Sequence, residues 1–318
     1  MAVSDTRIKE VVEFAALNGT EAALQAYSLP SETLNRYKRK YRQLYGDAST
    51  LMGKVREKFT DEQLSHLLSL GSDVKKTHQI QYDFTGEELT LLVITDTHYG
   101  SIFSPIERTY AAFEEAEKRG CDAMLHIGDI TEGHMNRPNS VYELSHIGYK
   151  QQRDLSIETL SKWKKPMYMC SGNHDDSFNN KLGAGLSMGE DVCNAIPNAT
   201  FVGEGDGLWI IPKYDIKVRL FHGIDAGSAY ALSYRLQRII NNMTPAQKPH
   251  ILLTGHDHKS FSMFYRNIHA VACGCLQKQS SWMTLKGIQA MEGFYIIKMG
   301  LAYNEVKWFE PRFYPFYK

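Results

Sequence analysis

Five short apolar segments of this 318-residue chain each end in a cluster of polar residues that are good metal ligands. The segments are LLVITDTHYG, MLHIGDITEG, MYMCSGNHDD, VRLFHGID and ILLTGHDHKS. A continuous apolar run of this length is typical of a strand that is buried on both faces. The carboxyl ends of such strands meet in one crevice of an α/β sheet, where ligands bind. The pattern therefore predicts an α/β domain with one polar site built from five strand ends.

The strand ends supply carboxylate, amide and imidazole side chains but no cysteine. The set comprises Asp96, His98, Asp129, Asn173, His174, His222, His256 and His258. Oxygen and nitrogen ligands without thiolates suit borderline to hard divalent cations, so we expect Mn²⁺ first, with Fe or Zn²⁺ as alternatives. The set is larger than one tetrahedral site needs, which favours two metal ions that share a bridging carboxylate.

The strand ends carry ordered motifs: Asp96-x-His98, Gly128-Asp129, Gly172-Asn173-His174-Asp175, His222 and Gly255-His256-x-His258. In residue type, order and spacing these motifs resemble those of the calcineurin-like metallophosphoesterase superfamily, over roughly residues 85–310. The resemblance implies a four-layer α/β/β/α sandwich around two mixed sheets.

The resemblance also implies a role for each site residue. Asp96, His98 and His258 would hold the first metal ion, Asn173, His222 and His256 the second, and Asp129 would bridge the two. His174 is expected beside the substrate phosphate, oriented by Asp175 or another acceptor, where it assists the leaving group. Two cations about 3.5–4 Å apart can hold a hydroxide that attacks phosphorus in line. We therefore expect a metal-dependent phosphoesterase.

The loop after the second motif bears on the substrate. Phosphoprotein phosphatases of the superfamily carry an arginine there, whereas this chain has GDITEGH, which argues against that branch. The loop loosely resembles that of repair-type DNA nucleases of the superfamily. His134 and Arg137 could contact phosphates from this loop, and an ordinary polar loop is the alternative.

Residues 1–47 are predicted to form a separate helical domain. Apolar residues recur at helical spacing from Ile8 to Ala15, and a short Ala-rich helix and the turn 28–30 follow. The third helix, 31–45, is basic, with one acid against Arg36, Lys38, Arg39, Lys40 and Arg42. The pattern resembles a helix-turn-helix, whose last helix enters the DNA major groove. The alternative is a basic hairpin that docks on the catalytic domain or on a protein partner.

The rest of the chain is divided by its sequence pattern into two parts. Residues 48–82 are predicted to be a linker with a short helix, and residues 83–318 to be the metallophosphoesterase domain. The architecture resembles phosphoesterases encoded by bacteriophages.

The overall composition limits the partners and the compartment. The 36 Lys and Arg residues balance 36 Asp and Glu residues, so the chain is not a uniformly basic nucleic-acid coat. No apolar run is long enough to span a bilayer, and the N-terminus is unlike a secretory signal, so we expect no membrane partner. An odd count of five cysteines indicates a reducing compartment. We expect the cytoplasm of a bacterial or phage-infected cell.

Together these features predict a two-metal phosphodiesterase that hydrolyses DNA. One alternative is a phosphatase or cyclic-nucleotide phosphodiesterase that acts on small substrates. Another alternative is a DNA-binding regulator with a silent phosphoesterase domain.

Overall fold

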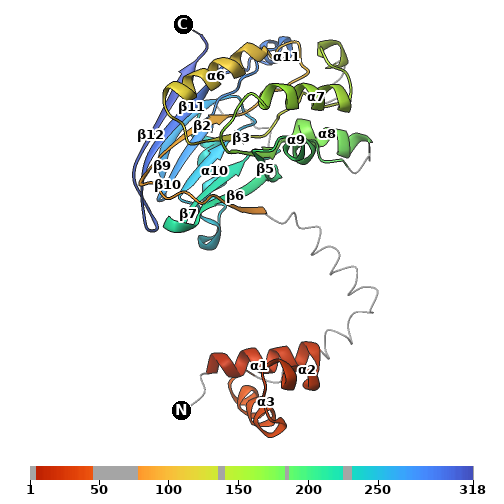
Figure 1. The fold of residues 1–318 in the computed structure, drawn as a ribbon, viewed down its shortest axis with the longest axis vertical. Helices are drawn as coiled ribbons and strands as arrows, with labels where there is room; N and C mark the ends of the chain where they lie inside the picture. The colour runs from red at the N-terminus through yellow and green to blue at the C-terminus, as the bar shows by residue number, and fades with distance from the viewer. Residues whose placement is uncertain (1–4, 46–77, 135–139, 183–185, 225–230, 318) are drawn as a thin grey trace. The chain divides into compact units, whose positions relative to one another are not determined.

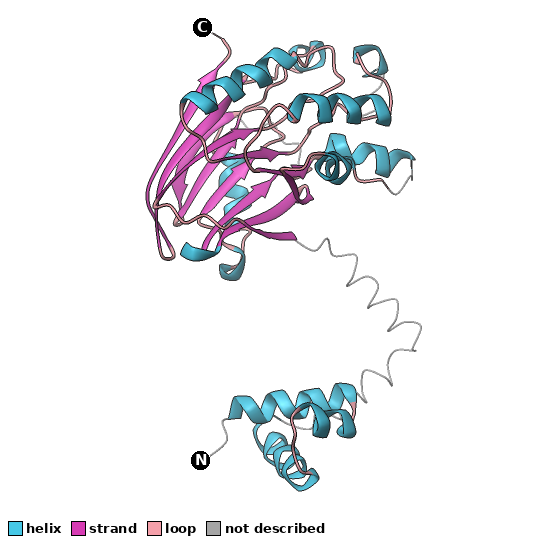
Figure 2. Ribbon diagram, viewed as in Figure 1, coloured by secondary structure: helices cyan, strands magenta, loops and turns pink. Residues whose placement is uncertain are grey.

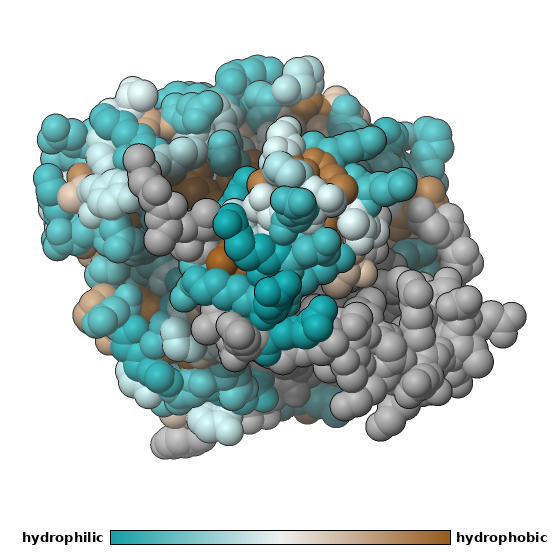
Figure 3. Space-filling model, turned by 90° about the horizontal axis from the view of Figure 1, so that it is seen from below, coloured by the Kyte–Doolittle hydropathy of each residue, from teal (hydrophilic) through white to brown (hydrophobic). Residues whose placement is uncertain are grey.

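The computed structural model describes residues 5–45, 78–134, 140–182, 186–224 and 231–317. These residues form two compact units, a helical unit up to residue 45 and a mixed α/β unit from residue 78 onward (Figure 1). Hydrophilic side chains cover most of the described surface on the face drawn in Figure 3. Within the described ranges, no helix is both long and apolar enough to cross a membrane.

The N-terminal unit consists of α1 (Asp5–Asn18), α2 (Thr20–Ala26) and α3 (Ser31–Tyr45), the three helices predicted for this region. Its core is one apolar cluster that joins all three helices. The buried members are Ile8, Val11, Val12, Ala15, Ala23, Leu34, Tyr37 and Tyr41. The apolar stripe of α3 is thus used within the unit, and its basic residues lie on the remaining faces.

The second unit contains two six-stranded mixed sheets. The order in the first sheet is β12-β11-β2-β3-β4-β5, in which β2, β3, β4 and β5 are parallel. Its strands are β2 (Glu88–Ile94), β3 (Ala123–Ile127), β4 (Met167–Ser171), β5 (Ala199–Glu204), β11 (Gly293–Ala302) and β12 (Glu305–Pro315). The order in the second sheet is β1-β6-β7-β8-β10-β9, in which β7, β8 and β10 are parallel. Its strands are β1 (His78–Gln81), β6 (Asp206–Ile211), β7 (Ile216–Phe221), β8 (Ile251–Thr254), β9 (Ser260–Tyr265) and β10 (Ile268–Cys273).

Alternate residues along a strand point to opposite faces of its sheet, and this alternation builds the layers. Leu91 and Val93 of β2 lie in the core between the two sheets, whereas Leu92 and Ile94 belong to a second core beneath the helices. Helices α6 (Ile106–Lys118), α7 (Tyr149–Leu160) and α9 (Met188–Ala195) contribute to that second core. Helix α10 (Tyr234–Asn241) covers the other sheet through a cluster of its own. The predicted four-layer sandwich is therefore confirmed (Figure 2).

The remaining helices are short and lie in the connections. They are α8 (Asn173–Leu182), α11 (Ser281–Leu285) and the 3₁₀ turns η1 (Ser140–Glu143), η2 (Pro212–Tyr214) and η3 (Pro245–Gln247). Residues 144–148 separate η1 from α7, and the last of them, Gly148, has a φ of +87°. Glycine adopts this left-handed conformation without a steric penalty.

The start of the second unit differs from the prediction. Residues 78–81, which the sequence pattern assigns to the linker, form β1 and pair in parallel with β6. Four residues carry too little periodicity to be recognised, and their strand conformation depends on the neighbouring strand. The short helix predicted for the linker lies outside the described residues.

The aromatic C-terminal segment packs on the body of the second unit. Phe313 contacts the core between the sheets, and Tyr314 and Phe316 contact the core beneath the helices. Tyr314 stacks on Phe294 of β11 with ring centroids 5.2 Å apart. The aromatic residues of this segment therefore close one side of the fold.

Candidate metal centre

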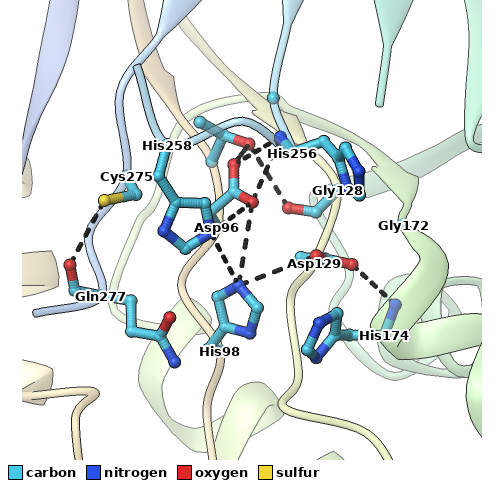
Figure 4. A network of polar contacts seen from close by, with 12 residues as sticks. Asp96, His98, Gly128, Asp129, Gly172, His174, His256, His258, Cys275 and Gln277 are labelled. Atoms are coloured by element: carbon cyan, nitrogen blue, oxygen red, sulfur yellow. Dashed lines mark hydrogen bonds and ion pairs between the residues drawn. The ribbon is translucent and has the colours of Figure 1, made fainter. Parts of the chain in front are cut away.

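The ends of five strands from both sheets meet at the predicted motifs. Strands β2, β3 and β4 are parallel neighbours in one sheet, and β7 and β8 are parallel neighbours in the other. Backbone hydrogen bonds join the first two motif loops, because Asp96 N donates to Gly128 O at 3.0 Å and His98 N to Asp129 O at 3.1 Å. Figure 4 shows the resulting cluster of carboxylates and imidazoles.

The first predicted ligand group is assembled as expected. Asp96, His98 and His258 place one ligand atom each within 4.8 Å of one another, and all three residues are buried. Nε2 of His258 lies 3.1 Å from Asp96 Oδ1, and Nε2 of His98 lies 3.3 Å from Nε2 of His258. The three donor atoms therefore converge on one point.

The second group contains Asp129, His222 and His256, whose ligand atoms also lie within 4.8 Å of one another. Asp129 Oδ2 is 3.1 Å from Nε2 of His222 and 3.7 Å from Nε2 of His98. This carboxylate thus lies between the two groups, at the place predicted for a bridging ligand.

Two orphaned atoms test whether a cation fits here. Asn173 Oδ1 and His222 Nε2 are buried and have no hydrogen-bond partner among the described residues. Nδ1 of His222 donates to the Ile127 carbonyl at 2.6 Å, so loss of the Nε2 proton to a binding cation would turn the Nε2 lone pair toward the Asp129 carboxylate. A lone pair and a carboxylate that face each other are both satisfied by a metal ion between them. The residues therefore fit a divalent metal centre.

The glycines of the motifs are required by close packing around these ligands. A Cβ at Gly172 would collide with Asp129 Oδ1 and would lie 2.7 Å from His222 Nε2. A Cβ at Gly128 would lie 2.6 Å from the His222 ring, and one at Gly255 would collide with the Thr95 hydroxyl. The spacing between these side chains leaves no room for such atoms, which explains the glycines directly before Asp129, Asn173 and His256.

Several ligand residues have a left-handed backbone, although they are not glycine. The φ angles are +50° at Asp96, +48° at His98, +50° at Asp129, +81° at His256 and +53° at His258. Such conformations cost on the order of 1–3 kcal/mol each and cluster at functional sites, where the surroundings enforce them. The strained turns direct the side chains of these residues into the cluster.

The electrostatics of the cluster favour positive charge. Burial alone would lower the pKa of His98, but Asp96 and Glu132 raise it to about 10. Burial also opposes a charged His222, yet Asp129 raises its pKa to about 9. Burial would raise the pKa of Asp129, and the surrounding histidines hold it well below its usual range. The carboxylates thus attract protons to these rings, and a bound cation would take the place of those protons.

His174 is partly exposed, as His256 is, and its ring also lies close to the ligand groups. Its side chain is 17% exposed, and it offers a ligand atom within 4.8 Å of those of His98 and Asp129. Nδ1 of His174 lies 2.7 Å from the Glu132 carbonyl oxygen, and its backbone N donates to Asp129 Oδ1 at 2.8 Å. The backbone position at the start of α8 thus ties His174 to the predicted bridging carboxylate.

Asp175 holds the motif loops rather than the His174 ring. Its carboxylate accepts backbone N–H groups of Ile130, Thr131 and Gly172 at 2.8–3.0 Å, and also the Thr131 hydroxyl. The sequence left open whether Asp175 or another acceptor holds the His174 ring. In the structure the acceptor is the Glu132 carbonyl. Asp175, grouped with His174 in the sequence prediction as the residue that orients its ring, instead holds the backbone of the motif loops.

Two residues of the centre were not predicted. Glu132 is buried, with Oε2 3.1 Å from His98 Nδ1 and 3.0 Å from the side-chain Nε2 of Gln277. Gln277 also donates its backbone N–H to Asp96 O at 3.0 Å. An acidic residue three positions after Asp129 was a usable signal for Glu132, whereas no motif marks Gln277.

Of the two predicted substrate-binding residues, the structure describes His134. The backbone N of His134 donates to Ser177 Oγ at 2.7 Å, and the Ser177 hydroxyl in turn donates to the His174 carbonyl at 2.5 Å. The ring centroid of His134 lies 6.2 Å from that of Phe178. His134 is therefore held next to the helix that carries His174. Arg137 lies outside the described residues.

The basic residues predicted to bind DNA all lie on α3. Lys38 donates to Thr20 Oγ1 at 3.0 Å, and Lys40 forms an ion pair of 2.7 Å with Asp5. These two lysines help to hold the three helices together. The other three basic residues, Arg36, Arg39 and Arg42, are exposed.

The sequence comparisons agree with the site. The family described as calcineurin-like phosphoesterase matches residues 89–260, which include every motif described above. This is more than half of the chain, and the chain belongs to that family of metal-dependent phosphoester hydrolases. A search of curated protein sequences finds no significant match.

Solved structures resemble the chain at low identity. An archaeal phosphodiesterase is 13% identical with a TM-score of 0.41, over 71% of this chain and 100% of that one. YfcE, a phosphoesterase from E. coli, is 14% identical with a TM-score of 0.40, over 70% and 98% of the two chains. Vps29 from Entamoeba histolytica, complexed with Zn²⁺, is 12% identical with a TM-score of 0.38, over 72% and 100%.

Proposed function

We propose that this chain is a phosphodiesterase that hydrolyses DNA and that its N-terminal unit binds the DNA. The observation that carries the proposal is the surface of α3. Its apolar stripe is used in the core of its own unit, while Arg36, Arg39 and Arg42 remain exposed at three-residue spacing. Side chains at i and i+3 are neighbours on a helix, so the three guanidinium groups can follow one line of phosphates.

The connection between α2 and α3 supports the same interpretation. Only residues 27–30 separate the two helices. Helix-turn-helix motifs use a turn of this size, and their second helix contacts the DNA. Because the whole chain has no net charge, the basic surface of α3 is a local feature, which favours a specific anionic partner.

The chain's own residues suit phosphodiester hydrolysis. Two divalent cations held here would neutralise the phosphate and activate a water molecule for attack. Their ligands are oxygen and nitrogen atoms, for which we propose Mn²⁺. His174 is anchored through Nδ1 to the Glu132 carbonyl, so Nε2 is the atom that exchanges a proton with the leaving group. His134 and Arg137 are proposed to contact neighbouring phosphates.

An exposed aromatic residue near the site supports a nucleic-acid substrate. Tyr142 in η1 is 81% exposed. The segment that follows η1 is joined to the loop after His98, because Leu144 pairs with Ser101 and Ser145 N donates to Gly100 O at 2.7 Å. Stacking on an aromatic side chain binds unpaired bases without regard to sequence. We therefore propose that Tyr142 stacks a base adjacent to the cleaved phosphate.

Hydrolysis assays on the full chain test the activity. Metal-free protein is reloaded with Mn²⁺ and given single-stranded DNA, duplex DNA, bis-p-nitrophenyl phosphate and p-nitrophenyl phosphate. We expect DNA cleavage that disappears in Asp129→Asn. Turnover of the small esters alone would favour a phosphatase or a cyclic-nucleotide phosphodiesterase.

A charge-matched comparison tests the DNA-binding unit. The triple substitution of Arg36, Arg39 and Arg42 by Gln is expected to weaken duplex binding and to lower the slope of log K against log salt by about 3. Turnover of bis-p-nitrophenyl phosphate should be unchanged. The control replaces the exposed lysines Lys118, Lys162 and Lys164 by Gln. Equal binding by both variants would contradict the role of α3, and DNA binding without any hydrolysis would favour a regulator.

A further inference from the structure

A buried arginine outside the five motifs links two of them. Arg235 of α10 is 4% exposed. Its Nη1 donates to the Gly255 carbonyl at 2.8 Å, and its Nη2 donates to the His222 carbonyl at 2.7 Å. These carbonyls belong to the loops after the neighbouring strands β7 and β8. One side chain therefore bridges the backbones of both loops, which are also joined directly by the hydrogen bond from Gly255 N to Phe221 O at 3.3 Å.

The two loops carry the histidines of the second ligand group. His222 itself supplies one carbonyl, and His256 directly follows Gly255, which supplies the other. In the first group, only His258 lies on either of these loops, and its carbonyl is held separately by Met291 N at 2.8 Å. The two hydrogen bonds of Arg235 thus act mainly on the second ligand group.

The two hydrogen bonds of Arg235 to backbone carbonyls suit a positioning role. Burial of a charged group is costly unless its donors are satisfied. Asp257 Oδ2 lies 3.9 Å from Nη1, farther than either carbonyl. The planar guanidinium presents donors in a rigid fork, which holds two acceptors at a defined separation. A lysine in the same place would keep the charge but would lose this geometry.

The position of Arg235 is set by the fold and not by the ligands. Two other residues of α10, Leu236 and Ile240, are buried in the apolar cluster that also contains Leu252 of β8. Helix α10 is therefore anchored by apolar contacts on the sheet, and Arg235 extends from this anchored helix to the motif loops.

We propose that Arg235 is a positioning residue that holds His222 and His256 at the spacing which the second cation requires. Without it, the second cation binds more weakly while the first is retained. The inference concerns the metal centre and does not depend on which phosphodiester is hydrolysed.

The test compares Arg235→Lys and Arg235→Met with Arg238→Met in the full chain. Arg238 is on the same helix and exposed, so its substitution controls for the loss of a positive charge. Mn²⁺ bound per chain is measured by equilibrium dialysis and elemental analysis. Thermal unfolding is recorded with and without Mn²⁺. Loss of an outer-shell partner typically weakens metal binding 10- to 100-fold.

We expect both Arg235 variants to bind one Mn²⁺ as the wild type does and the second one 10- to 100-fold more weakly. The Mn²⁺ concentration for half-maximal turnover of bis-p-nitrophenyl phosphate should rise by the same factor, with kcat restored at high Mn²⁺. If both Arg235 variants bound Mn²⁺ as tightly as the wild type does, the proposal would be overturned. This holds whether or not the metal-free variants unfold at a lower temperature. Failure of both Arg235 variants to fold, while Arg238→Met folds, would assign Arg235 to the fold and would also overturn it.

Discussion

Substitution of Gly172 by alanine is expected to damage the centre through a single added carbon atom. The new Cβ would collide with Asp129 Oδ1, and it would lie 2.5 Å from Asp129 N and 2.7 Å from His222 Nε2. Ordinary contacts to carbon are near 3.5 Å, so these groups must separate by about 1 Å. Asp129 and His222 belong to the second candidate ligand group and come from different sheets, so no single loop movement relieves both contacts.

The expected loss follows from that displacement. A misplacement of 1 Å at a catalytic centre costs about 100-fold in rate, which corresponds to about 2.7 kcal/mol. Overpacking also destabilises the fold by about 1–3 kcal/mol, or a few degrees in unfolding temperature. Turnover of bis-p-nitrophenyl phosphate at saturating Mn²⁺ and thermal unfolding of the metal-free protein measure the two effects separately.

Gly120→Ala is the matched control. Gly120 has φ +69° and nothing within 4 Å of an added Cβ, so alanine there adds about 1 kcal/mol of backbone strain without a collision. We expect this variant to keep wild-type turnover. If Gly172→Ala retained turnover and Mn²⁺ content close to those of Gly120→Ala, the steric reasoning would be refuted.

Four further predictions concern single side chains of the second unit. His174→Ala should keep both Mn²⁺ ions but lose about 10²–10⁴ in turnover, and full activity would contradict its role with the leaving group. Asp129→Asn should lose Mn²⁺ and activity together in elemental analysis and turnover, and an unchanged metal content would exclude it as the bridge. Glu132→Gln removes the carboxylate 3.1 Å from a ligand imidazole, so a Mn²⁺ titration should show about 10–100-fold weaker binding. Burial lowers the pKa of His126 to about 3. Between pH 6.5 and pH 3 the unfolded chain therefore binds a proton at His126 that the folded chain does not bind. The free energy of unfolding consequently falls by about 1.4 kcal/mol for each unit by which the pH is lowered. Thermal unfolding of metal-free wild type and His126→Gln at pH 7 and pH 5 checks the last effect, and equal pH dependence in both proteins would contradict it.

The metal ligands could be predicted from sequence because of how parallel strands are built. Each ligand follows a short apolar run, and the carboxyl ends of parallel neighbours lie at one edge of a sheet. The loops that carry Asp96 and Asp129 therefore lie side by side although they are far apart in the chain, and His222 reaches Asp129 from the other sheet. Residue type, apolar runs and order along the chain are local information, and they sufficed for this part of the site.

The supporting residues could not be predicted in the same way. Gln277 and Arg235 contact the ligand loops only through the packing of the loop after β10 and of helix α10. A glutamine in a loop and an arginine in a helix are common and carry no periodic signal. Their roles depend on distances between segments that are distant in sequence.

The sequence by itself determined the helices of the first unit, the central strands of the second unit and the residues that are candidate ligands, because each follows from a local pattern of apolar and polar residues. Tertiary structure alone decided that residues 78–81 form a strand and that Asp175 bonds backbone amides while the Glu132 carbonyl holds His174. It also decided that the aromatic end of the chain packs on the sandwich. The physical reason is that hydrogen-bond partners and buried neighbours are chosen by proximity in space, which a local pattern does not encode.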